Sequence, residues 1–166
     1  MSRSRFDTEQ TAIHEAGHAV GAAAMGYALE SVTIEPTRKH SGYCLLTRPP
    51  MSHTDSLIYQ LCGPVAESQW VGGRLGMNDA HGWRTDVERC GDALAMVRES
   101  STGNPWHSAE FRSAAKSAFS IIRTNWRVVD HIAKLLITHR VLSGADVAVA
   151  MHKLRGVGCV VYTEAA

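Results

Sequence analysis

The sequence predicts a mainly α-helical domain with a small β-sheet, of the α+β class. Alanine-rich and 3.6-periodic apolar stretches recur along the chain, two short apolar runs suited to strands lie near its front, and no repeat or low-complexity segment interrupts it. With 166 residues, 45% hydrophobic and 20% charged, the chain can bury one core but is too short for two ordinary domains. We therefore expect a single domain over residues 1–166.

The front of the chain predicts one helix followed by two strands. Asp7 and Gln10 have the spacing of a capping box, and an alanine-rich stretch follows them up to a glycine, so a helix is expected over residues 8–25. The next two apolar segments are short, and the first of them alternates with polar residues. They predict a pair of strands at residues 31–35 and 43–47.

Two further helices are expected in the middle of the chain. Apolar residues at helical spacing predict a helix around residues 57–66, which Gly63-Pro64 is expected to kink or interrupt. A glycine-rich, irregular segment follows. Thr85, with an acidic residue three positions later, matches a second capping box, and this places Asp86 in the first turn of the next helix.

The last third of the sequence is helical in pattern. Apolar residues from Phe111 to Leu136 keep a helical period and predict either one helix or two helices broken near Asn125. Ser143 is expected to cap a last short helix. Residues 156–166 are expected to form a tail.

Composition and charge disfavour several kinds of partner. The formal net charge is +1, too small for a field that would hold nucleic acid. The apolar stretch from Ala19 to Leu29 is about half of the roughly 20 residues that span a bilayer, and no signal-peptide pattern precedes it. The four cysteines form no CxxC pair, as is typical of reduced thiols. We expect a cytoplasmic protein with no nucleic-acid partner and no membrane span.

The motif that carries chemistry is His14-Glu15-Ala16-Gly17-His18, an HExxH sequence inside the first predicted helix. Residues four apart share one face of a helix, so both imidazoles can point at one metal ion. Neutral imidazole is a good ligand for Zn²⁺, and a catalytic zinc site needs only three protein ligands. Glu15 is then the base that takes a proton from a water molecule activated by the zinc.

A third ligand must come from elsewhere in the chain, and spacing leaves several candidates open. Each of them carries a carboxylate or an imidazole, either of which zinc accepts. The candidates are Glu35, Glu67, Asp79, His81, Asp86 and Asp92.

The sequence resembles the peptidase domain of the FtsH-type ATP-dependent zinc metalloproteases. The similarity covers most of the chain and is most specific at the HExxH helix. Its blocks are residues 14–20, residues 32–36 with Gly42-Tyr43, residues 61–67, residues 85–89, and the stretch from Trp126 through residues 142–147. The resemblance implies a zincin-like helical peptidase fold and identifies Asp86 as the third zinc ligand.

The chain departs from that family in ways that change the expected function. It has no GxxxxGK[ST] phosphate loop. After Gly63, Pro64 replaces the family's second glycine-arginine pair, and Ser68 stands where a second glutamate is usual. We therefore expect an ATP-independent zinc metallopeptidase that hydrolyses peptides or unfolded proteins. A homo-oligomer is compatible with the resemblance, although the ATPase modules that help to hold the family's ring are missing.

A second function and a substrate-binding element also follow from the sequence. The alternative to a peptidase is a non-catalytic, zinc-stabilised binding or regulatory module of the same fold, although such a module would not need Glu15. An intramembrane zinc protease is disfavoured because no span is encoded. For the peptidase, residues 31–35 or 43–47 are expected to offer a strand edge to which an extended peptide pairs.

Overall fold

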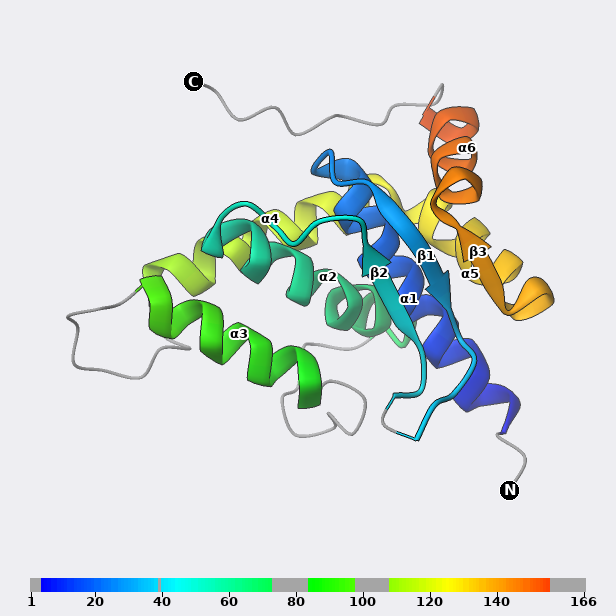
Figure 1. The fold of residues 1–166 in the computed structure, drawn as a ribbon, viewed down its shortest axis with the longest axis horizontal. Helices are drawn as coiled ribbons and strands as arrows, with labels where there is room; N and C mark the ends of the chain where they lie inside the picture. Colours follow the sequence, from blue (N-terminus) through cyan, green and yellow to red (C-terminus); the bar gives the residue numbers. More distant parts are fainter. Residues whose placement is uncertain (1–3, 39, 73–83, 98–107, 156–166) are drawn as a thin grey trace.

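The computed structural model describes residues 4–38, 40–72, 84–97 and 108–155 (Figure 1). Within them the protein is mainly helical, with one small antiparallel sheet, as the sequence predicts. The elements in chain order are α1 (Arg5–Ala24), β1 (Leu29–Thr33), β2 (Tyr43–Leu46), α2 (His53–Trp70), α3 (Arg84–Val97), α4 (Ala109–Thr124), α5 (Trp126–His139), β3 (Val141–Ser143) and α6 (Gly144–Arg155). None of these helices is long and apolar enough to cross a membrane.

Helix α1 begins three residues before the predicted start. Its capping box uses Ser4 and Asp7, not Asp7 and Gln10. The Ser4 hydroxyl accepts from the Asp7 amide at 3.1 Å, and the Asp7 carboxylate accepts from the Ser4 amide at 3.3 Å. The Ser4 cap was not predicted; it satisfies the first backbone amides of the helix by the same chemistry, one turn earlier.

Helix α2 runs continuously through Pro64, so of the predicted kink or interruption, the interruption is wrong. A proline inside a helix removes one backbone hydrogen bond and costs about 3 kcal/mol. Here residues 57–68 are all buried, because α2 packs against α1, α3 and α4. The apolar burial of this central helix outweighs the local cost of the proline.

The sheet has the strand order β2-β1-β3, with both pairs antiparallel. Strand β1 begins two residues before the predicted segment and β2 ends one residue early. Val32 lies opposite Cys44 on one side and Leu142 on the other. Strand β3 was not predicted, because three residues are too short to show an alternating pattern. Strand β2 forms one edge of the sheet and lies beside α1 (Figure 1).

The remaining helix boundaries follow the sequence closely. The helical pattern of the last third is divided at Asn125, between α4 and α5. The Asn125 side chain donates to the carbonyl of Ile121 at 2.8 Å and so ends α4. The Ser143 hydroxyl accepts from the Asp146 amide at 3.2 Å and caps α6, as predicted. Helix α3 begins at Arg84, one residue before Thr85, and places Asp86 in its first turn.

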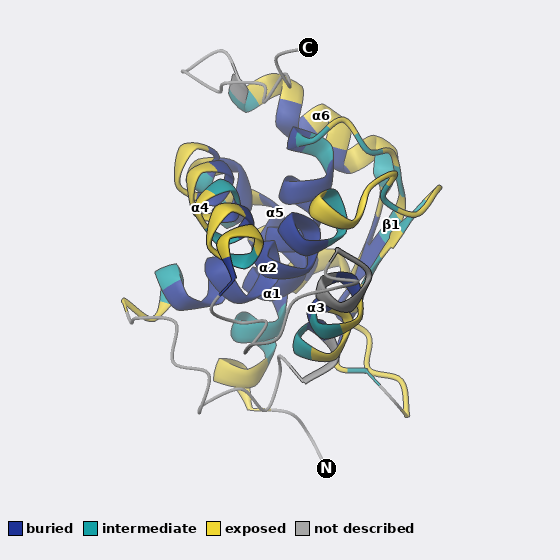
Figure 2. Cartoon of the chain, turned by 90° about the vertical axis from the view of Figure 1, so that its left-hand side faces the viewer, coloured by how far each residue is buried: buried dark blue, intermediate teal, exposed yellow. Residues whose placement is uncertain are grey.

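The core surrounds the crossing of α1 and α2 (Figure 2). Two glycines of α1 bring these helices close together, since a Cβ atom at Gly17 would lie 2.6 Å from the carbonyl oxygen of Cys62. At Gly21 it would lie 2.7 Å from the Cys62 Cβ. No real side chain tolerates such contacts. The middle of α1, which carries the HExxH motif, is therefore held against α2.

Candidate metal centre

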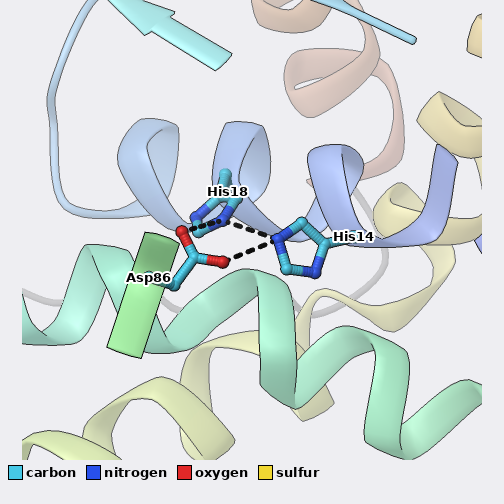
Figure 3. Close-up of side chains that lie close together, drawn as sticks. All are labelled: His14, His18 and Asp86. Atoms are coloured by element: carbon cyan, nitrogen blue, oxygen red, sulfur yellow. Dashed lines mark hydrogen bonds and ion pairs between the residues drawn. The ribbon is translucent and has the colours of Figure 1, made fainter. Parts of the chain in front are cut away.

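The structure brings His14, His18 and Asp86 together (Figure 3). The two histidines lie one turn apart on α1, and Asp86 reaches them from the first turn of α3. The Asp86 carboxylate lies 2.9 Å from the Nε2 atom of His14 and 3.5 Å from the Nε2 atom of His18. The two Nε2 atoms are 3.1 Å apart. All three side chains are buried, between 5% and 8% exposed.

The spacing of these atoms suits a tetrahedral metal ion. Zinc binds imidazole nitrogen and carboxylate oxygen at about 2.0–2.2 Å, which places neighbouring ligand atoms roughly 3.3 Å apart. The observed separations of 2.9, 3.1 and 3.5 Å surround that value, although they involve both oxygens of Asp86. Two nitrogens and one carboxylate oxygen are also a donor set that zinc accepts.

The other nitrogen of each imidazole is held by an acceptor. The Nδ1 atom of His14 lies 3.1 Å from the carboxylate of Glu67, and the Nδ1 atom of His18 lies 2.9 Å from the backbone carbonyl of Tyr59. The Tyr59 carbonyl can only accept, and Glu67 accepts as a carboxylate, so we assign the hydrogen to each Nδ1 atom. In the neutral rings the lone pairs are then on the Nε2 atoms, and these face the same point.

Glu67 was a candidate for the third ligand, and the structure gives it a different place. One of its carboxylate oxygens meets His14, and the other accepts a hydrogen bond from the side chain of Gln10, one turn earlier on α1. It therefore orients an imidazole from outside the cluster. The available signal was a carboxylate within a continuously apolar stretch of a predicted helix, since such a group needs a partner when it is buried.

Gly63 makes room for the two imidazoles. A Cβ atom at this position would lie 2.7 Å from the Cδ2 atom of His18 and 2.9 Å from the Nε2 atom of His14. Any other residue would push α2 away from the histidines or displace their rings. The Gly63-Pro64 pair, which suggested a break in the helix, thus contains the glycine that lets α2 pack against both imidazoles.

Glu15 is buried at 6% exposure and lies under the turn before β2. A Cβ atom at Gly42 would lie 2.9 Å from its Oε1 atom, so the glycine leaves space for the carboxylate. Burial raises the pKa of Glu15, while the nearby His14 and His18 act in the opposite direction. Glu15 is therefore a carboxylate of increased basicity within electrostatic reach of the cluster.

In the metal-free protein, the side chains of His14 and Asp86 strongly shift each other's pKa. Burial disfavours the charged form of His14, but its hydrogen bonds to Asp86 and Glu67 outweigh this and raise its pKa to about 10. Burial raises the pKa of Asp86, and the two imidazoles more than reverse this, so the pKa ends well below its usual value. In the metal-free protein, a proton on His14 thus supplies the positive charge next to Asp86 that a bound metal ion would supply in its place.

The other candidate ligands lie elsewhere. Glu35 is exposed, beyond the end of β1, and Asp92 is exposed on α3. Asp79 and His81 lie outside the described residues. Among the described residues, His14, His18 and Asp86 form a cluster whose ligand atoms all lie within 4.8 Å of one another, close enough to share a metal ion.

No protein-family model matches the chain, and no curated protein matches it. The resemblance to FtsH-type peptidase domains is therefore carried by the residues of this chain alone.

Proposed function

We propose that the protein is a zinc metallopeptidase, with His14, His18 and Asp86 as zinc ligands and Glu15 as the general base. The observation that carries the proposal is the direction of the imidazoles. Both Nδ1 atoms are bound to acceptors, so the two Nε2 atoms and one carboxylate face a common point. A structural zinc site is usually closed by four protein ligands, whereas three converging donors leave the open position that a catalytic zinc site requires.

The chain's own residues supply the remaining parts of hydrolysis. His14, His18 and Asp86 would hold the zinc ion, which when bound would lower the pKa of a water molecule towards neutrality. Glu15 accepts the proton of the attacking water and transfers it to the departing amine. Its burial favours the protonated form and so makes it a stronger base. Glu67 holds His14 in orientation during this exchange.

We propose peptides or unfolded proteins as substrates, because strand β2 offers a sheet edge beside α1. An extended peptide can pair with such an edge through its backbone, independently of its sequence. The resemblance to FtsH-type peptidases supports the same substrate class. We also propose that the enzyme acts in the cytoplasm and without ATP. A homo-oligomer is compatible with this proposal.

The Glu15→Gln variant tests the proposal. We expect it to retain zinc and to lose hydrolysis of an unfolded protein by about 10²–10⁴-fold, the usual contribution of a general base. Glu9→Gln is the matched control, because Glu9 lies on the same helix and pairs with the largely exposed Arg5 at 2.8 Å. It should retain zinc and activity. Zinc binding without cleavage of any substrate would instead favour the binding-module function, and undiminished activity in Glu15→Gln would refute the mechanism.

A further inference from the structure

Tyr59 joins three parts of the molecule. Its backbone carbonyl accepts the hydrogen bond from His18 at 2.9 Å, and its ring lies 5.0 Å from the His18 ring. Its hydroxyl donates to the backbone carbonyl of Cys44 in strand β2 at 3.1 Å. The residue is buried, at 6% exposure. One side chain of α2 thus contacts a proposed metal ligand and an edge strand at the same time.

The hydrogen bond from Tyr59 reaches a strand at the edge of the sheet. Strand β2 pairs with β1 along one side only, because it forms an edge of the sheet. A hydrogen bond from another element can help to hold such an edge strand in place. The Tyr59 hydroxyl supplies such a hold, and the stiff aromatic ring fixes its distance from His18.

Catalysis by a positioned base depends on where the substrate lies. A misplacement of about 1 Å between reacting groups costs on the order of 10²-fold in rate. A peptide paired with β2 takes its position from that strand, whereas the attacking water takes its position from the His14, His18 and Asp86 cluster. The two positions must therefore be fixed relative to each other by groups of the protein.

We propose that Tyr59 is a positioning residue whose hydroxyl sets strand β2 in register with the metal centre, so that a bound peptide is aligned for attack. The inference rests on the proposed function, since it assigns the alignment of that reaction's substrate. Tyr59 needs no contact with the substrate. It acts through Cys44 on one side and through His18 on the other.

The Tyr59→Phe variant removes the hydroxyl and keeps both the ring and the carbonyl that hold His18. We expect unchanged zinc affinity and a fall of roughly tenfold in kcat/KM for an unfolded protein or an extended peptide, the usual effect of one lost hydrogen bond. For a dipeptide, too short to pair with β2, the change should stay below about twofold. Backbone amide exchange of β2 should become faster.

Tyr27→Phe is the matched control. The Tyr27 hydroxyl also ties a chain segment to α2, through Asp55 at 2.5 Å and the amide of Met51 at 3.0 Å, but it makes these contacts at the start of the helix. Its loss should leave kcat/KM unchanged for both substrates.

The outcomes separate this inference from the function on which it rests. If the wild type cleaves the extended peptide and Tyr59→Phe cleaves it equally well, or loses activity on both substrates alike, the positioning role is refuted and the peptidase stands. If the wild type cleaves neither substrate, the proposed function fails. Faster exchange in β2 of Tyr59→Phe would then show the mechanical link without a peptidase, and unchanged exchange would refute that link too.

Discussion

The two histidines of the cluster are the same kind of ligand in different surroundings. His14 donates to a carboxylate, that of Glu67, which is itself held by Gln10. His18 donates to a neutral backbone carbonyl and lies against the ring of Tyr59. The first arrangement adds negative charge behind an imidazole and the second adds none. We infer that the His14 side governs how strongly a cation is held, while the His18 side governs where it lies relative to the sheet.

Gly63→Ala should disturb both histidines alike, because the added methyl group would meet the His14 ring and the His18 ring. We expect zinc binding to be lost and the free energy of unfolding to fall by about 1–3 kcal/mol, the usual cost of overpacking. Zinc titration and urea unfolding measure the two effects.

The control for that variant is Gly91→Ala on α3, where an added Cβ atom has no neighbour within 4 Å. Alanine is the better helix former, so this change should stabilise the protein by about 0.5–1 kcal/mol and leave zinc binding intact. Equal zinc affinity in the two variants would show that α2 does not confine the imidazoles.

Glu67→Gln should lower the zinc affinity through His14 alone, because Glu67 contacts the Nδ1 atom of that histidine. The substitution keeps the size of the side chain and removes its charge, and loss of such a partner typically costs 10–100-fold in metal affinity. Competition with a chelator of known affinity measures this change. A zinc affinity equal to that of the wild type would mean that the carboxylate behind His14 contributes nothing, and the proposed difference between the two histidines would be wrong.

The smallest expected effect is the pH dependence that the protonation of His14 gives to stability and zinc binding. Without metal, and despite burial, the hydrogen bonds of His14 to Asp86 and Glu67 raise its pKa to about 10. Protonated His14 therefore stabilises the metal-free fold fully at pH values below the unfolded pKa of about 6.5. This stabilisation should be lost as the pH rises from there through 10. Zinc requires neutral His14, so binding at pH 7 should release about one proton. Calorimetry in buffers of different ionisation enthalpy measures this release, and its absence would contradict the protonated state.

Much of the fold could be predicted from local patterns. The periodic apolar residues gave the helices, and Asn125 and Ser143 marked a break and a cap because their side chains bond to nearby backbone. Strand β3 and the continuous course of α2 through Pro64 could not be predicted. Both depend on partners far away in the sequence, whose packing outweighs local preference.

The candidate site divides in the same way. His14, Glu15 and His18 follow from spacing within one helix, but spacing alone left six candidates for the third ligand. Asp86 came from the resemblance, and the structure now places it beside both imidazoles. The roles of Glu67 and Tyr59 depend on how α2 crosses α1, which no local pattern encodes.

The most direct test of the account is the zinc content of the purified protein, measured together with that of Asp86→Asn. We predict one tightly bound zinc ion per chain in the wild type and a large loss of zinc in the variant. A wild type that holds no divalent cation after equilibration with zinc, or a variant that holds it equally well, would contradict the proposed metal centre.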